Sequence, residues 1–557
     1  AAPIATQRAF AQDASVTLPQ INIISSSPLP APRRPPQKRA ATAPTTAIPT
    51  APAASQSPAP AVPGAVEADK VPANVQIVPA ADFDHATAPD LLSALARELP
   101  GVSLGDQTGN QFQLDLNYRG FTSSPLIGTP QGLAVYQNGV RINEVFGDVV
   151  NWDFIPGDAI RQITLVPSNP VYGLNAIGGA LSFEMKNGFT YQGVETELSG
   201  GSFGRIGASM QAGGQVGNLS GYVAADAIDD AGWRQFSPSQ IRRLYADLGA
   251  RGDDSEFHVT FTAADNNFGA TAATPMQMLA QDWSSVYTVS QTTQNQLAFL
   301  TASAAWKPTD TLAYQAVVYF RNFRQLHVDG NGTDACTSSY CPDTNNVNPC
   351  PPGSNVCFRA VNGSGYFDLG YPSSLGSDVL GEIDRTWTNT NSFGGSAQVA
   401  SSADLFGHGN NFVLGLSVDR GFVQFTESSE LGTVNPNTFP FVDGLGFLIN
   451  APAGDVAPVQ MGAQTLYTGV YATDTFDLTN RLAVTAGARF NIAQIALTDQ
   501  LGNDPALNGS HDYNHFNPMI GATYKLTPNL TLYGDYAIAN RAPTPLELGC
   551  SDPTRPC

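Results

Sequence analysis

The stretch that decides the fold runs from Tyr118 to Gly188 and reads YRGFTSSPLIGTPQGLAVYQNGVRINEVFGDVVNWDFIPGDAIRQITLVPSNPVYGLNAIGGALSFEMKNG. Short apolar alternations at 133–136, 163–165 and 181–183 lie between Gly, Pro and Asn residues that favour turns. Asn138-Gly139 is a strong hairpin signal, because both residues tolerate positive φ. The stretch therefore predicts a compact domain of short strands, and nothing in it suggests catalysis.

Several motifs before and within this stretch follow a recognisable order. Leucines follow Asp90 at nearly helical spacing until Pro100-Gly101 ends the pattern. The motifs are DLLSALARELPGV (90–102), YRGF (118–121), QNGVRINE (137–144), VNWDFIP (150–156) and NPVYGLNAIGGALSFEMKNG (169–188). In this order they resemble the plug domain of TonB-dependent outer-membrane receptors, over residues 76–188. The resemblance implies that Arg119 pairs with barrel glutamates and holds the plug.

One motif departs from the family. Many members carry Arg-Gly-Pro after the strand that corresponds to 163–166, whereas residues 166–170 here read VPSNP. The sequence therefore gives no basis for a second arginine–glutamate lock of the usual form.

The composition favours a large β structure with a lipid-facing surface. Only 13% of the 557 residues are charged, against about 25% in an ordinary soluble domain, and Gly occurs 53 times. The 47 acidic residues outnumber the 27 basic ones, which argues against nucleic acid as a partner, since phosphate binding needs a basic face. The sequence has no apolar run of the length, about 18 residues or more, that marks a transmembrane helix; barrel strands alternate and leave only a weak hydropathy signal.

From Tyr191 onward, apolar and polar residues alternate in long segments. Leu312, Tyr314, Ala316, Val318 and Phe320 alternate with Gln315, Tyr319 and Arg321, and 482–492 and 530–538 repeat the pattern. Short turns at 217–218, 308–310, 479–480 and 527–529 alternate with polar insertions at 266–291, 326–377, 428–458 and 499–512. This asymmetry is typical of outer-membrane barrels with short periplasmic turns. A soluble β-sandwich is the alternative, but strands of roughly 12–18 residues are too long for it.

The predicted fold is mainly β. We expect an N-terminal α+β plug domain (76–188) inside a transmembrane antiparallel β-barrel (189–557). About 13 strands are countable, whereas plugged transporters have 22. The segment 540–548 should lie in an extracellular loop, and the usual aromatic C-terminal residue is missing. We therefore expect a fragment of a longer barrel.

The N-terminal tail (1–25) contains the isolated apolar segment LPQINII (18–24). Such a segment cannot bury itself locally and is available for strand addition by a partner. With the plug behind it, the segment resembles a TonB box, and the expected TonB-binding residues are Leu18, Ile21, Asn22, Ile23 and Ile24. A signal-peptide remnant with a random apolar patch is the alternative. Residues 26–75, rich in Ala and Pro, predict an extended disordered linker.

The six cysteines form local pairs along the sequence. Spacing and loop composition favour small disulfides in an oxidising compartment, with the connectivity left open, over a zinc site without a companion histidine. The cysteines are Cys336, Cys341, Cys350, Cys357, Cys550 and Cys557, and Cys550–Cys557 is the favoured pair.

No enzyme motif or metal site is expected. His511 and His515 would lie some 13 Å apart on one strand face, and Asp329–Asp334 lacks the glutamate of a calcium loop. We expect the substrate where upper plug loops meet the barrel, although loop solvation or plug packing is the simpler explanation for each residue taken alone. The candidates are Ser123, Ser124, Leu126, Ile127, Asn143, Glu144, Phe146, Asp148, Trp152, Arg321 and Arg324.

By resemblance the chain is an energised importer in the Gram-negative outer membrane. Its expected partners are TonB, membrane lipid, and a small-molecule or metal-chelate substrate, most simply a ferric siderophore, with no cofactor. A passive porin-like channel and a surface receptor or adhesin are the alternatives. A porin, however, needs no apolar box, linker or plug.

Overall fold

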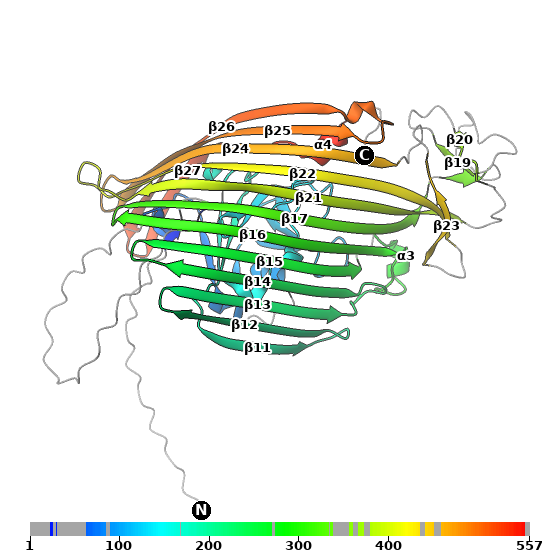
Figure 1. Ribbon diagram of the computed structural model, residues 1–557, viewed down its shortest axis with the longest axis horizontal. Helices are drawn as coiled ribbons and strands as arrows, with labels where there is room; N and C mark the ends of the chain where they lie inside the picture. Colours follow the sequence, from blue (N-terminus) through cyan, green and yellow to red (C-terminus); the bar gives the residue numbers. More distant parts are fainter. Residues whose placement is uncertain are drawn as a thin grey trace, which may run out of the picture.

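The computed structural model describes residues 23–25, 29, 63–84, 90–167, 169–269, 273–333, 335–337, 356–359, 366–371, 379–434, 440–450 and 458–551. Two structural units dominate this part of the chain: a small mixed domain, called the plug here, and a large curved antiparallel sheet, called the barrel sheet. Figure 1 shows the strands of the barrel sheet side by side, with the blue and cyan plug behind them. Among the described residues, no helix has the length and apolar character needed to cross a membrane.

The plug contains two sheets. The first has the order β3 (Gln76–Pro79), β9 (Ile160–Val166), β10 (Gly179–Met185), β7 (Leu133–Gln137) and β8 (Val140–Arg141), in which β10 and β7 are parallel. The second joins β4 (Val102–Gly105), β5 (Asp115–Tyr118) and β6 (Phe121–Ser123). The hairpin expected at Asn138-Gly139 is confirmed, because both residues have positive φ, 47° and 84°, between β7 and β8.

Short helices complete the plug. They are α1 (Ala80–Asp84), α2 (Leu91–Glu98) and the 3-10 turns η1 (Ala68–Lys70), η2 (Trp152–Phe154), η3 (Gly157–Ala159) and η4 (Pro170–Tyr172). The expected helix start at Asp90 is confirmed, since its side chain accepts a hydrogen bond from the Ser93 N–H and caps α2. Leu92 and Leu95 on α2 are buried in an apolar core with Ile163, Leu181 and Phe183 of the sheet.

The barrel sheet has 14 strands, of which β23 (Val442–Leu448) lies off the main path and pairs with β22. Each of the others pairs antiparallel with the next one in the path, so about 13 strands, as the sequence predicts, form the wall. They are β11 (Gly193–Gly200), β12 (Ile206–Val216), β13 (Leu219–Asp230), β14 (Ser239–Arg251), β15 (Ser255–Gly269), β16 (Gln291–Thr309), β17 (Leu312–Gly332), β21 (Val379–Ser401), β22 (Asn410–Val434), β24 (Val459–Asp477), β25 (Leu482–Asp499), β26 (Gly509–Thr527) and β27 (Leu530–Ala537).

The two faces of the barrel sheet differ in chemistry. On β17, Tyr314, Val318 and Phe320 are 43%, 59% and 46% exposed on the outer face, whereas Gln315 and Arg321 are buried against the plug. At the short-turn end, the outward rings of Trp306 and Tyr314 stack 5.4 Å apart. An apolar exterior with aromatic borders and a polar interior is what a lipid-embedded barrel requires.

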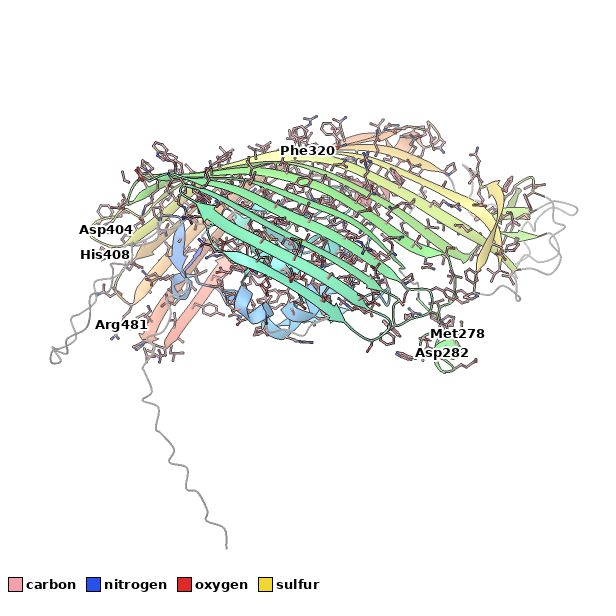
Figure 2. The ribbon with its side chains drawn as sticks, turned by 60° about the horizontal axis from the view of Figure 1, so that its bottom comes forward. Met278, Asp282, Phe320, Asp404, His408 and Arg481 are labelled. Atoms are coloured by element: carbon pink, nitrogen blue, oxygen red, sulfur yellow. The ribbon has the colours of Figure 1, made fainter. Side chains whose placement is uncertain are left out.

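The two ends of the sheet differ in their connections. The long connections carry α3 (Met276–Leu279), β18 (Cys336–Thr337), β19 (Val356–Arg359), β20 (Tyr366–Asp368) and η5 (Pro505–Leu507). In Figure 2, Met278 and Asp282 lie at that end, Asp404, His408 and Arg481 lie at the opposite end, and Phe320 lies between them. Several strands continue into the stretches predicted as insertions, since β17 extends to Gly332 and β22 to Val434, so part of the predicted loop length is strand.

Candidate functional site: the boundary between plug and barrel

A cavity separates part of the plug from the barrel wall. Its empty space amounts to about 1090 Å³, part of which is open solvent. The plug contributes Tyr136, Arg141, Asn143, Glu144 and Asp148, and the wall contributes residues of β17, β21, β22, β24 and β25. Four of the predicted substrate residues, Asn143, Glu144, Asp148 and Arg321, are therefore brought together here.

A buried ion pair crosses this boundary. The Arg321 guanidinium on β17 lies 2.6 Å from the Glu144 carboxylate on the plug, with side-chain exposures of only 6% and 2%. Burial raises the pKa of the Glu144 carboxyl, and the charge of Arg321 opposes that rise. Sequence reasoning chose both residues as substrate ligands; in this structure they bind each other. Here the plug supplies the carboxylate and the barrel supplies the arginine. The resemblance implied the opposite arrangement, in which Arg119 of the plug pairs with barrel glutamates.

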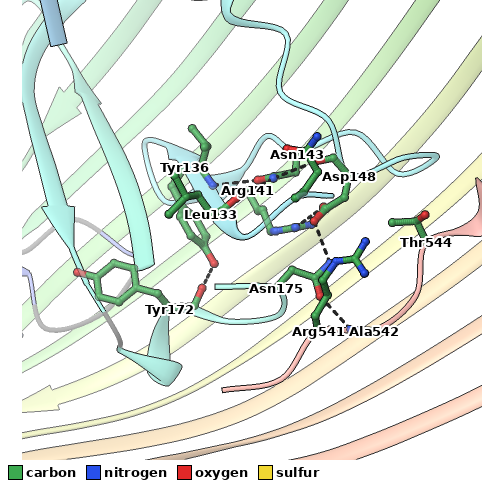
Figure 3. Close-up of polar contacts among 12 residues, drawn as sticks. Leu133, Tyr136, Arg141, Asn143, Asp148, Tyr172, Asn175, Arg541, Ala542 and Thr544 are labelled. Carbon is green, nitrogen blue, oxygen red and sulfur yellow. Dashed lines mark hydrogen bonds and ion pairs between the residues drawn. The ribbon is translucent and has the colours of Figure 1, made fainter. Parts of the chain in front are cut away.

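Asp148 organises the loop next to this ion pair (Figure 3). Its carboxylate pairs with Arg141 and accepts a hydrogen bond from the Asn175 amide at 2.9 Å, while its carbonyl accepts one from Asn143 at 3.1 Å. Asn175 in turn accepts a hydrogen bond from the Ala542 N–H at 2.9 Å. Loop 143–148, the 170–176 segment and the chain after β27 therefore share one polar network.

The chain after β27 folds back onto the plug. The side-chain oxygen of Asn540 accepts hydrogen bonds from the amides of Asn491 (3.1 Å) and Asn517 (2.7 Å) on the barrel wall. Its backbone carbonyl accepts one from the Asn175 N–H at 3.3 Å. Helix α4 (Pro545–Gly549) begins at a capping box made by Thr544 and Glu547, and the Leu546 N–H bonds to the Phe146 carbonyl. Sequence analysis placed this segment in a loop and missed its contact with the plug; only the Thr-Pro-Leu-Glu pattern signalled an ordered helix start.

Further polar contacts join the plug to the wall, beside apolar contacts such as Phe112 with Ile241 and Phe268. The Asp153 carboxylate, whose pKa is raised by burial, accepts hydrogen bonds from Asn266 at 2.7 Å and Asn295 at 3.3 Å. Arg243, paired with Asp226, donates to the carbonyl of Ile155 at 2.9 Å. Each contact joins a plug group to an inward side chain of a strand.

The other predicted substrate residues lie elsewhere. Ser123 and Ser124 are fully buried inside the plug, and Trp152 packs in its core, 3% exposed. Phe146 stacks on Phe425 of the wall with ring centroids 4.7 Å apart. Leu126 and Ile127 lie on a loop and do not line the cavity.

Arg324 is also absent from the cavity, and its predicted position there is corrected. It is three residues beyond the buried Arg321 on β17, so strand alternation turns it to the exposed outer face.

Arg119 lies at an exposed turn with φ 50°, and its guanidinium is 5.1 Å from the Tyr118 ring centroid. Among the described residues it forms no ion pair. Its role in holding the plug stays a prediction.

The segment that leads into the plug, here called the approach to the plug (residues 63–75), contacts the barrel sheet at its short-turn end. β1 (Ile23–Ser25) pairs antiparallel with β2 (Ala65–Glu67), so the backbone of Ile23 and Ile24 lies in a strand. Leu18, Ile21 and Asn22 lie outside the described residues. Asp69 pairs with Lys525 at 2.5 Å and Lys70 with Asp477 at 2.9 Å, near the short turns of β24–β27.

Strands β18 and β19 place Cys336 directly opposite Cys357, and both side chains are buried. Cys341, Cys350 and Cys557 lie outside the described residues, and Cys550 follows α4. The described residues contain no group of three or more His, Cys, Asp and Glu side chains suited to a metal ion.

Two family models match this chain. The TonB-dependent receptor plug domain matches residues 67–180, and the β-barrel domain of TonB-dependent receptors matches residues 353–555. With the plug and the barrel sheet described above, these matches show that the chain belongs to the TonB-dependent receptor family. No curated protein matches the sequence.

Solved receptors have the same fold. The unliganded ferric citrate transporter FecA aligns with a TM-score of 0.62 at 12% identity, over 83% of this chain and 62% of that one. The siderophore receptor PiuA from Acinetobacter baumannii gives 0.64 at 14%, over 88% and 68%. The open form of the ferric-catecholate import receptor Fiu from E. coli K12 gives 0.60 at 15%, over 86% and 71%. The chain thus spans about two thirds of the length of these receptors, and at such identities the likeness concerns the fold alone.

Proposed function

We propose that this chain belongs to an outer-membrane importer that takes up a small metal chelate, most simply a ferric siderophore, with energy supplied through TonB. The observation that carries the proposal is a separately folded plug that meets the inner barrel face through a buried ion pair and hydrogen bonds as well as apolar contacts. The polar contacts among these can be exchanged for contacts with water or ligand at small net cost. A plug of this kind can hold the lumen shut and still be displaced.

The substrate class is supported by the relatives with the same fold. Their names describe transporters or receptors for ferric citrate, ferric catecholates and siderophores, and one is a copper transporter. In this chain the cavity beside Glu144, Asp148 and Arg321 is the place where a ligand would meet plug and wall together. A ligand that changes the Glu144–Arg321 pair or the Asp148 network would favour one plug state over another, which is the physical requirement for signalling.

The partner on the other side would bind by strand addition. Residues 18–24 would supply the apolar segment, of which Ile23 and Ile24 pair with β2. TonB would have to replace β2 as the partner of this strand. The ion pairs of Asp69 and Lys70 at the short-turn end support this proposal, because short turns are typical of the periplasmic end of such barrels.

The local disulfides remain part of this proposal, with their connectivity left open, and none of the described cysteines is free. Non-reducing peptide mapping would identify the pairs, and six free thiols would reject them.

The experiment compares Ile23→Pro with Ser55→Pro, a control in a linker already rich in proline. Proline removes a backbone donor and prevents strand pairing. In cells without competing receptors, Ile23→Pro should lower uptake of a radiolabelled ferric siderophore about tenfold or more, with surface binding unchanged. Ser55→Pro should behave like the wild type. Equal uptake by both variants would reject the TonB-box assignment and make a passive channel the better account. Binding without any energised uptake, even by the wild type, would favour a receptor or adhesin.

A further inference from the structure

The plug meets β22 at two places, and the cavity lies between them. Near the short-turn end of the strand, Val171 of η4 is completely buried in an apolar cluster with Val413. Nearer the long-connection end, Phe146 stacks on Phe425 with ring centroids 4.7 Å apart. Ser417, between the two places along the strand, lines the cavity. Along β22 the cavity is therefore bounded at both ends by plug side chains. We call it the compartment, and its two ends the Val171 contact and the Phe146 contact.

The Val171 contact combines apolar packing with an arginine of the wall. The other buried members of its cluster come from β21, β22, β24 and β26 and are Ala400, Val413, Tyr471 and Met519. Arg489 on β25 donates to the Val171 carbonyl at 3.4 Å and to the Ser417 hydroxyl at 2.7 Å. Its guanidinium lies against Gly469 of β24, where any Cβ would overlap it. Because Arg489 and Ser417 also line the compartment, the arginine links this contact to the compartment interior.

The Phe146 contact is apolar and belongs to plug loop 143–148. The buried wall residues in its cluster are Val423, Phe425, Met461, Ala463, Ile495 and Leu497. The preceding plug residue, Val145, packs on Gly421 of β22, where a Cβ would lie 2.5 Å from the Val145 side chain. On the same loop, Glu144 pairs with Arg321, and both residues line the compartment. A movement of the loop therefore changes this contact and the ion pair together.

Between the two contacts the compartment is polar. Its lining includes arginines, carboxylates, tyrosines and the hydroxyl groups of Ser392, Ser396, Ser417 and Thr465. Four buried polar atoms at its border have no hydrogen-bond partner among the described residues: Nε of Arg141, Nε of Arg321, Oε2 of Glu144 and Oγ of Ser396. Buried polar atoms are normally satisfied by protein, water or ligand. The compartment therefore suits a hydrophilic, oxygen-rich solute.

A second cavity lies on the other side of the plug. Its empty space is about 890 Å³, part of it open solvent, and it is lined by the plug and by β11–β14, with Ser209 on β12 among its residues. The covalent connection from the plug to β11 lies on its short-turn side. There Gly188 packs so closely on β13 that a Cβ would overlap the carbonyl oxygen of Gly221. A connection that cannot leave the wall closes this side, whereas the Val171 contact is non-covalent.

We propose that the compartment is a transit site, in which an anionic, oxygen-rich metal chelate pauses between two successive openings of the plug boundary. The Phe146 contact opens first, on the long-connection side, and the Val171 contact opens second. Arg489 couples the two steps. It donates to neutral oxygen atoms of Val171, Ser417 and Asn491, and an anionic oxygen in the compartment is a stronger acceptor than any of these. A chelate that draws Arg489 away from the Val171 carbonyl weakens the second contact. The inference rests on the proposed function and adds the route.

The first test fills each cavity with one large side chain in the full-length receptor. Ser396→Trp places an indole in the compartment, and Ser209→Trp places one in the second cavity as the matched control. The probe is whichever radiolabelled chelate wild-type cells take up, ferric citrate or a ferric tris-catecholate. Ser396→Trp should lower energised uptake about tenfold or more, because the added volume blocks the route, with surface binding in cells without TonB unchanged. Ser209→Trp should behave like the wild type.

Equal uptake by Ser396→Trp and the wild type would overturn the inference, and so would a block by Ser209→Trp alone. If Ser396→Trp fails to reach the membrane, Ser392→Trp replaces it, since Ser392 also lines the compartment from β21.

The second test holds each contact closed with a short cross-linker that a reductant cleaves. With Phe146→Cys/Phe425→Cys joined, bound chelate should stay exchangeable with unlabelled chelate outside, because it cannot enter the compartment. With Val171→Cys/Val413→Cys joined, energised cells should retain the label against exchange, because the chelate enters and cannot leave. Cleavage should restore uptake in both variants, which excludes a folding defect. Equal exchange in the two cross-linked variants would overturn the two successive openings.

Uptake by the wild type separates this inference from the proposed function. TonB-dependent uptake in the wild type together with normal uptake by Ser396→Trp rejects the transit site alone. Binding without energised uptake in the wild type rejects the importer, and the transit site with it.

Discussion

The interior of the plug is almost entirely apolar, whereas its boundary with the barrel combines apolar contacts with buried ion pairs and hydrogen bonds. Inside the plug, Leu95, Ile163 and Phe183 are completely buried among apolar neighbours. At the boundary, Glu144, Asp153 and the carbonyl of Ile155 bind side chains of the barrel wall. Apolar contacts also join the two units: Phe146 stacks on Phe425, Phe154 packs edge-on against Phe323, and further plug side chains share apolar clusters with the wall. A domain with its own apolar core can stay folded while the polar part of its contacts with the wall is exchanged.

The largest effect should come from the plug interior. Phe183→Ala removes a ring that is completely buried and packs edge-on against Trp152 at 6.4 Å. Loss of a buried Phe costs about 3–5 kcal/mol, so the plug should become sensitive to protease at lower urea. Phe393→Ala, on the outer barrel face, is the matched control and should leave the plug unchanged. Equal urea curves for Phe183→Ala and the wild type would contradict the apolar core.

The buried ion pair should come next, and its two partners should be strongly coupled. Arg321→Met leaves the Glu144 carboxylate buried without its cation, which costs about 3 kcal/mol. The double variant Glu144→Met/Arg321→Met should recover most of that loss, because neither charge is then buried alone. Hydrogen exchange of the backbone amides in loop 143–148 measures the loss of stability in the single and in the double variant. Additive losses in the double variant would mean that the two residues act independently.

A smaller effect is expected at Asp153. Asn266→Ala removes hydrogen bonds of 3.0 and 2.7 Å to the Asp153 carbonyl and carboxylate. A hydrogen bond to a charged group contributes about 1.5–3 kcal/mol, so η2 should exchange its amides faster. Asn267→Ala changes the exposed neighbour on the outer face of β15 and serves as the control. Identical exchange in the two variants would show that Asn266 does not hold the plug.

The smallest effect should come from the half-exposed ion pair at the approach to the plug. Lys70 and Asp477 are 2.9 Å apart with side-chain exposures of 31% and 26%. Lys70→Ala should change plug stability by at most about 1 kcal/mol, and the change should vanish at high salt. Lys307→Ala removes a cation whose partner Asp310 is 99% exposed and should change nothing. A loss that persists at high salt would point to packing by the lysine stem instead of charge.

The sequence predicted the barrel faces well because they follow from local alternation. Tyr314, Val318 and Phe320 point outward, and Gln315 and Arg321 inward, as their order along one strand requires. The same rule could have excluded Arg324 from the cavity, since it is an odd number of residues from Arg321. Chemical type alone made it a substrate candidate.

The candidate site was predicted only in part. Glu144, Asp148 and Arg321 were chosen correctly as residues near the meeting of plug and barrel, but not as partners of residues in the chain itself. Ser123, Ser124 and Trp152 were chosen from the same loops and are packed inside the plug. Loop composition cannot separate a polar side chain that faces a cavity from one that is buried in its own domain.

The sequence by itself determined the plug hairpin at Asn138-Gly139, the cap of α2 and the alternation of the barrel strands, since each depends on neighbours a few residues away. The tertiary structure decided that Glu144 meets Arg321 and that Asn175 meets Ala542. These contacts depend on how the plug sits in the lumen and on which strands are adjacent. Both are set by many weak interactions between residues far apart in the chain, and no short stretch of sequence encodes them.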